Sequence, residues 1–136
     1  MDKKEFLSRY HNLQEMIERK KKYIEFCAQR ASSVSSPSFS DERVDISPSY
    51  EAPFVKWRNK EMDAERELKD LEKQAEEAKC EIESVIARLD SDEYKMLLLY
   101  RYIDWMLWIE IASKLCCSLQ TVYRWHREAL IKIDTM

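Results

Sequence analysis

The chain has 136 residues, of which 45% are apolar and 36% charged, and its formal net charge is −3. This size suits one or two small units rather than a large enzyme, and the mixture favours long amphipathic helices over a large globular core. Glycine is absent, so backbone conformations with positive φ are costly, and both tight hairpins and Gly-rich phosphate-binding loops are disfavoured. We therefore expect an all-α protein.

Residues 1–31 are expected to form the first of two coiled-coil helices. Their apolar side chains recur every three, four or seven residues, as one face of a helix requires. These side chains are Phe6, Tyr10, Leu13, Ile17, Ile24, Cys27 and Ala31. Residues 32–53 are rich in serine, proline and acidic side chains and have no periodicity, so they predict a flexible linker.

Residues 54–90 are expected to form the second coiled-coil helix. Small and aliphatic side chains alternate there by three and four residues, the pattern of a coiled-coil seam. The seam consists of Leu68, Leu71, Ala75, Ala78, Ile82, Val85 and Leu89. Neither long helix can bury its apolar face alone, so we expect an antiparallel hairpin whose remaining apolar edge pairs with a second copy.

Residues 91–136 are expected to form a compact C-terminal bundle. Asp90 and Glu93 have the spacing of a capping box ahead of a mostly apolar helix over 94–103. A short connection over 104–107 follows. The stretch 108–130, WIEIASKLCCSLQTVYRWHREAL, then has the spacing of a helix-turn-helix.

Within this stretch, a short helix is expected to turn Ile111, Ala112 and Leu115 inward. A turn over residues 116–118 follows, and Ser118 is a suitable N-cap for the next helix. That helix should bury Val122, Trp125 and Ala129 and expose Gln120, Tyr123, Arg124 and Arg127.

The stretch LLLYRYIDWMLWIEIASKLCCSLQTVYRWHREALIKI resembles the region-four helix-turn-helix of bacterial sigma factors. It is closer still to the RinA- and ArpU-type phage transcriptional activators, through its RYI, IEIA and REAL elements and the layout of a helical hairpin before the motif. The resemblance implies that Leu119, Gln120, Tyr123 and Arg124 fall at base-reading positions. Cys116 departs from this pattern because glycine is usual there, and Leu107 departs because Ser or Thr commonly caps the first helix.

Eight residues are candidates for DNA contact. Gln can pair bidentately with adenine and Arg with guanine, whereas Arg127, further along the helix, could hold a phosphate. The full set is Ser118, Leu119, Gln120, Thr121, Tyr123, Arg124, Arg127 and Lys114. The alternative interpretation of this face is an ordinary solvated helix surface.

Other residue types predict little chemistry. Cys27, Cys80, Cys116 and Cys117 form no CxxC pair, and the adjacent Cys116 and Cys117 are expected to be reduced thiols at the turn. The compartment is expected to be the cytosol. His126 with Cys116 and Cys117 fits no familiar metal-ligand spacing. A packing role is expected for Trp108 and Trp125. We expect no enzymatic activity, cofactor, metal, small-molecule substrate or membrane span.

The sequence thus predicts a cytoplasmic, sequence-specific DNA-binding regulator of phage or prophage transcription. The last 46 residues carry six basic and six acidic side chains, so one chain offers few phosphate contacts and a homodimer is expected. The resemblance also implies contact with RNA polymerase. Three alternatives remain: a DNA-packaging factor like a small terminase subunit, a protein-interaction module that never touches DNA, and a repressor or inhibitor of a host system.

Overall fold

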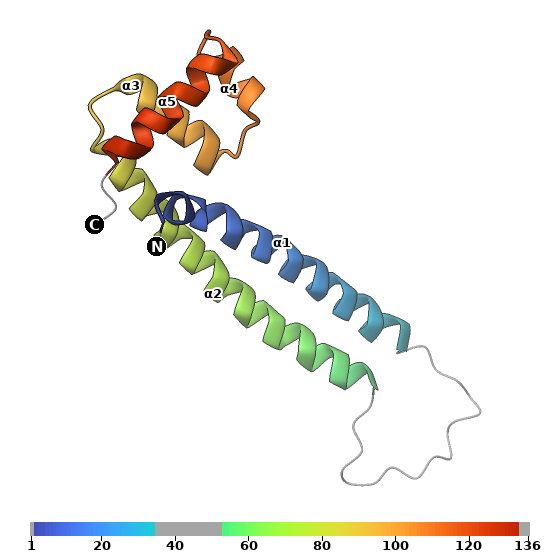
Figure 1. Cartoon of the computed structure of the whole chain (residues 1–136). Helices are drawn as coiled ribbons and strands as arrows, with labels where there is room; N and C mark the ends of the chain where they lie inside the picture. Colours follow the sequence, from blue (N-terminus) through green and yellow to red (C-terminus); the bar gives the residue numbers. More distant parts are fainter. Residues whose placement is uncertain (1, 35–52, 134–136) are drawn as a thin grey trace, which may run out of the picture. The chain divides into compact units, whose positions relative to one another are not determined.

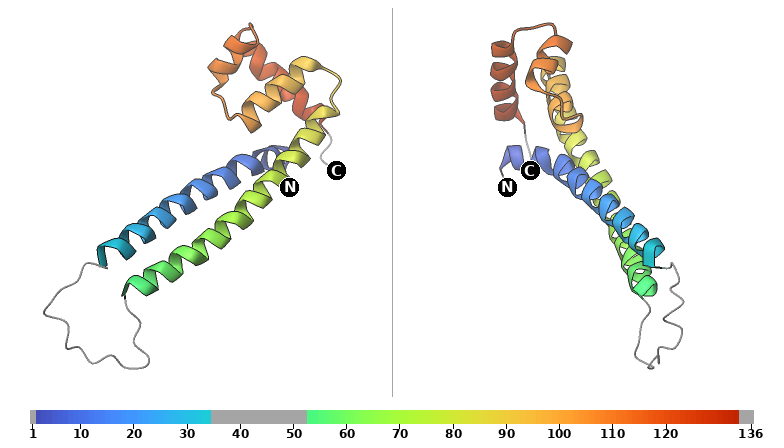
Figure 2. Two further views of the ribbon diagram at one scale, coloured as in Figure 1. Left: turned by 180° about the vertical axis from the view of Figure 1, so that it is seen from behind. Right: turned by 90° about the vertical axis from the view of Figure 1, so that its right-hand side faces the viewer.

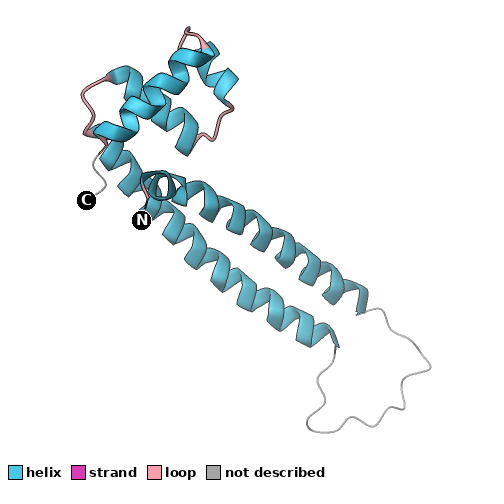
Figure 3. Cartoon of the chain, in the orientation of Figure 1, coloured by secondary structure: helices cyan, strands magenta, loops and turns pink. Residues whose placement is uncertain are grey.

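A computed structural model describes residues 2–34 and 53–133, and within these ranges the chain is all-helical (Figures 1 and 3). The elements are α1 (Lys3–Val34), α2 (Pro53–Ala87), α3 (Asp92–Leu98), the π-helical turn η2 (Leu99–Ile103), α4 (Trp108–Lys114) and α5 (Leu119–Lys132). The expected all-α class is therefore confirmed. Among the described helices, none is long and apolar enough to cross a membrane.

The two long helices form where their apolar periodicity predicts them. Helix α1 runs three residues past the expected end at 31, and α2 begins at Pro53 and ends at Ala87, three residues before the expected 90. Proline is favoured in the first turn of a helix because its missing N–H would have no partner there. Most of the predicted linker, residues 35–52, lies outside the described residues.

The chain divides into two compact units. An arm unit comprises Met16–Leu71, and a bundle unit comprises Met1–Glu15 together with Glu72–Met136. Each unit contains part of α1 and part of α2, so both units contain contacts between the two long helices.

In the arm unit, one large aliphatic side chain and three small ones are buried: Ile17, Cys27, Ala31 and Ala64. The seam residues Leu68 and Leu71 are only half-buried here. An aromatic and cationic cluster joins the two helices. The rings of Phe26 and Trp57 meet edge-on with their centroids 5.6 Å apart, and the Arg30 guanidinium lies over both rings. Lys20 also pairs with Glu67 at 2.5 Å.

In the bundle unit, the start of α1 packs beside the end of α2 (Figures 1 and 2). The seam residues Ala75, Ala78, Ile82, Val85 and Leu89 are all buried, as the heptad pattern predicts. Leu7 of α1 is also fully buried, and Arg9 pairs with Glu81 at 2.9 Å.

Helices α3, α4 and α5 gather into one bundle (Figures 1 and 2). Leu97, Leu98 and Tyr102 of α3 and η2 lie buried in its centre, as the mostly apolar helix over 94–103 predicts. The prediction that Asp90 and Glu93 form a capping box is wrong. Ser91 is the N-cap, because its extended backbone lets Oγ accept from the Tyr94 N–H at 3.4 Å, while its hydroxyl donates to Glu93 at 2.9 Å.

The connection between η2 and α4 is held in place by side chains. Trp105 has a φ of 53° and stacks on His11 with the ring centroids 3.6 Å apart. Arg101 donates to the Met106 carbonyl at 2.9 Å and lies over the rings of Trp105 and Trp108. These contacts order the connection that precedes α4.

Candidate nucleic-acid interface

Helices α4 and α5 form the helix-turn-helix that the sequence predicts. Ile111 and Ala112 of α4 are buried, and so are Val122 and Ala129 of α5. Trp125 is half-buried against the same core. Since this side of α5 is fixed in the core, Tyr123, Arg124 and Arg127 are held on its other side.

The turn between the two helices is a Schellman motif. The Cys116 N–H donates to the Ser113 carbonyl at 3.2 Å, and the Cys117 N–H donates to the Ala112 carbonyl at 3.0 Å. Cys116 takes a left-handed backbone with φ 56°, where glycine is usual. The turn thus keeps its form without glycine, and the strain falls on one residue.

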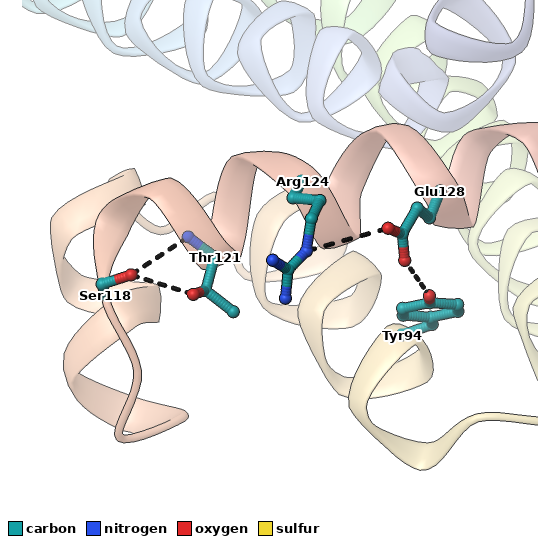
Figure 4. Close-up of polar contacts among 5 residues, drawn as sticks. All are labelled: Tyr94, Ser118, Thr121, Arg124 and Glu128. Carbon is teal, nitrogen blue, oxygen red and sulfur yellow. Dashed lines mark hydrogen bonds and ion pairs between the residues drawn. The ribbon is translucent and has the colours of Figure 1, made fainter.

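The start of α5 is capped by Ser118, as predicted. Its Oγ accepts from the Thr121 N–H at 3.2 Å and lies 2.9 Å from the Thr121 hydroxyl oxygen (Figure 4). Ser118 and Thr121, two of the candidates for DNA contact, therefore contact each other at the N-terminus of the helix. Because backbone N–H groups and the positive end of the helix dipole meet there, this end of α5 favours an anion.

The start of α4 is capped in a different way. Leu107 stands at the N-cap position and its side chain cannot accept a hydrogen bond. Glu110 instead accepts from the Leu107 N–H at 3.0 Å, which is one half of a capping box. This contact explains how α4 begins at Trp108 without the usual Ser or Thr.

The predicted reading face of α5 is exposed. Leu119, Gln120, Tyr123, Arg124 and Arg127 are exposed, and Ser118 and Lys114 are exposed at and before the turn, whereas Thr121 is half-buried. The Tyr123 ring meets Trp108 edge-on at 5.6 Å. The eight candidates thus share one helix and its turn, with Lys114 at the end of α4.

One acidic side chain within this face was not singled out from the sequence. Glu128 lies one turn after Arg124, and its Oε1 is 3.8 Å from the Arg124 Nε. Its other carboxylate oxygen accepts a hydrogen bond from the Tyr94 hydroxyl of α3 (Figure 4). This hydrogen bond raises the pKa of the Tyr94 phenol. The i, i+4 spacing could have indicated the ion pair, but the link to α3 depends on tertiary packing.

A buried polar pair was also missed. His126 is 8% exposed, and its Nε2 lies 2.7 Å from the Tyr102 hydroxyl. Burial lowers the pKa of the His126 imidazole to about 4 and raises that of the Tyr102 phenol to about 12. The phenol therefore stays protonated and can donate to a neutral imidazole, which satisfies both groups inside the bundle.

The remaining aromatic and cysteine side chains have packing roles or lie at the surface. Trp108 is half-buried and meets His126 edge-on at 4.8 Å. The four cysteines carry free thiols, with Cys116 exposed and Cys117 half-buried. The His126 Nε2 already faces the buried Tyr102 hydroxyl, and the described residues contain no group of three side chains that could hold a metal ion.

A family model described as a protein of unknown function, DUF1492, matches residues 33–134, so the chain belongs to this family. The match covers α2, the bundle helices and the whole helix-turn-helix. The chain matches no curated protein and no solved structure.

Proposed function

We propose that this member of the DUF1492 family binds double-stranded DNA through α5 and regulates transcription, in the manner implied by its resemblance to RinA- and ArpU-type phage activators. The observation that carries the proposal is the exposed face of α5, with Gln120, Tyr123 and Arg124 outward on a helix whose opposite side is buried. The major groove admits a single helix presented in this way.

The exposed residues divide by chemistry into base readers and backbone contacts. Gln120 and Arg124 carry the side chains that pair bidentately with adenine and guanine. Arg127, Lys114 and the capped N-terminus at Ser118 suit phosphate oxygens, which position the protein without reading sequence.

A homodimer in the cytosol of a bacterial host completes the proposal. With a net charge of −3, one chain binds DNA weakly at physiological salt, and two chains double the phosphate contacts. The arm unit supports this part of the proposal because Met16 and Tyr23 stay exposed and line a groove beside Leu71. Contact with RNA polymerase rests on the resemblance alone.

Selection of bound duplexes from a random library tests the proposal. A shared sequence motif is expected, and absence of any enriched motif would overturn it. Arg124→Ala should then cost about 1–3 kcal/mol on the selected site and relax the preference at one base pair.

Arg127→Ala is the matched comparison because it removes the same side chain one turn further along α5. It should weaken binding to selected and random DNA alike if Arg127 holds a phosphate. Equal losses on both DNAs for Arg124→Ala would contradict its role as a base reader, and a loss confined to the selected site for Arg127→Ala would contradict its role at a phosphate.

A second candidate function is contact with another protein through the start of α4. Leu107 and Ile109 are 63% and 68% exposed, which is unusual for two aliphatic side chains so close together. A double variant of Gln120 and Arg124 that still regulates transcription fully in cells would favour this function over DNA binding.

A further inference from the structure

We propose that Glu128, anchored by Tyr94, positions the Arg124 guanidinium for base reading and so determines sequence specificity. The inference rests on the proposed DNA-binding function and extends it to residues outside the predicted reading set. Three side chains from two helices carry it (Figure 4).

The first step concerns the two oxygens of the Glu128 carboxylate. One accepts the Tyr94 hydroxyl, and the other, Oε1, faces the Arg124 Nε at 3.8 Å. An isolated i, i+4 pair on a helix surface contributes little, because two long side chains must be ordered to form it. Here the acid is already held by a side chain from α3, so only the arginine remains to be ordered.

The second step concerns Tyr94 itself. It belongs to the first turn of the capped helix α3, where Ser91 accepts from its backbone N–H. Its ring is half-buried, and Lys132 of α5 lies over it with the ammonium 5.2 Å from the ring centroid. Tyr94 therefore contacts α5 at two positions, Glu128 and Lys132, and has little freedom to move.

The third step concerns the free edge of Arg124. Figure 4 shows the Nε facing Glu128 and the two terminal nitrogens directed away from it. Those two nitrogens carry four of the five guanidinium N–H groups. The Arg124 side chain is 59% exposed and that of Glu128 is 43% exposed. Anchoring Nε therefore leaves an accessible edge that suits bidentate pairing with guanine.

The fourth step is that Glu128 has two opposed effects on DNA binding. Its negative charge repels phosphates and lowers affinity for every duplex. Its contact with Arg124 removes part of the ordering cost of a long side chain, which is worth about twofold to tenfold in affinity where that side chain binds a base. Specificity, measured as the ratio of selected-site to random-duplex affinity, separates the two effects.

The test measures this ratio for the full chain and three variants. Tyr94→Phe frees the carboxylate without changing charge, and the ratio should fall by about twofold to tenfold. Glu128→Gln should lower the ratio while raising affinity for random duplex. Asp92→Asn is the control, because it also removes one negative charge. Asp92 lies at the exposed start of α3, where it pairs with Lys95 and not with Arg124.

A second measurement needs no DNA. It responds to positioning of Arg124 and would not change if Tyr94 and Glu128 only stabilised the bundle. Nitrogen relaxation of the Arg124 Nε–H should report greater side-chain mobility in Tyr94→Phe and Glu128→Gln than in the unmodified chain and Asp92→Asn. Thermal unfolding of each variant verifies that the bundle is intact.

The outcomes are distinguishable. If the unmodified chain selects a motif, but its specificity ratio and Arg124 mobility are unchanged in Tyr94→Phe and Glu128→Gln, the positioning role is overturned and DNA binding stands. If Glu128→Gln strengthens all duplexes equally and Tyr94→Phe changes nothing, Glu128 acts by repulsion alone. A chain that selects no motif overturns both the function and this inference.

Discussion

Cys116 is the residue at which the turn of the helix-turn-helix stores strain. Its φ of 56° places a side chain where only glycine is free of steric cost, which is about 1 kcal/mol for other residues. Both Schellman hydrogen bonds nevertheless form around it. The thiol at 116 is therefore tolerated by the turn and is not required for it.

Cys116→Gly should stabilise the chain by up to about 0.5 kcal/mol, since relief of about 1 kcal/mol of strain exceeds the added entropy of the unfolded glycine. Urea-induced unfolding followed by circular dichroism measures the change. Cys80→Gly is the control, because the exposed Cys80 lies within α2 and should cost about 1 kcal/mol. Destabilisation by Cys116→Gly would contradict this account of the turn.

His126 makes the stability of the bundle depend on pH. Its folded pKa of about 4 lies below the ordinary value of 6.5. Between these values the unfolded chain takes up a proton that the folded chain resists, so stability falls as pH decreases from 6.5 to 4. The loss amounts to about 3 kcal/mol at most, and it is absent above pH 6.5.

His126→Gln should flatten this part of the stability profile relative to the unmodified chain, measured by urea unfolding at a series of pH values. His11→Gln is the control because it replaces the other of the two histidines. It should leave the acid-side loss in place. The same slope in His126→Gln and the unmodified chain would show that other groups cause the loss.

At the scale of elements, the heptad seam of α2 decides how the long helices pack in the bundle unit. Ile82 is completely buried, and it lies in the core cluster that contains Phe6 and Leu7 of α1. The seam alanines Ala75 and Ala78 are buried too but have less surface to contribute. Ile82 therefore provides more of the burial than either alanine.

Ile82→Asp should destabilise the bundle unit by several kcal/mol, because a carboxylate would be buried there without a partner. Circular dichroism at 222 nm during heating, a wavelength that reports helix content, measures the loss. Cys80→Asp places the same side chain at an exposed position of α2 and should have little effect. Unchanged helicity and melting temperature in Ile82→Asp would contradict the seam.

At the scale of the whole molecule, the proposed DNA binding has to be reconciled with a net charge of −3. Duplex DNA is a polyanion, so affinity depends on the number of phosphates that basic side chains neutralise. Arg127 and Lys114 are two exposed candidates for such contacts. In the proposed dimer, a second copy would supply the same contacts again without changing the charge balance of each chain.

We expect sedimentation equilibrium to give twice the 16.4 kDa chain mass, and the selected DNA to contain two half-sites. Met16→Glu in the arm groove should weaken this dimer, whereas Lys22→Glu, which does not line the groove, should not. A monomer that still binds its site with full specificity would contradict dimerisation. A ring of many copies would favour a DNA-packaging factor.

The sequence by itself determined the helices, because periodicity and capping are local properties of a chain. The seam from Ala75 to Leu89, the Ser118 cap and the outward set around Arg124 were all predictable from spacing. The N-cap at Ser91 was missed because Asp90 and Ser91 can both act as an N-cap, and only the backbone geometry distinguishes them.

Only the tertiary structure decided which polar groups meet across helices. His126 with Tyr102, Glu128 with Tyr94, and His11 with Trp105 are separated by 24 to 94 positions along the chain. No periodicity relates such residues, because their contact depends on how the bundle helices and α1 pack. For the same reason, the contact of Tyr94 with Glu128 and the polar pair packed behind α5 emerged from the fold and not from the motif.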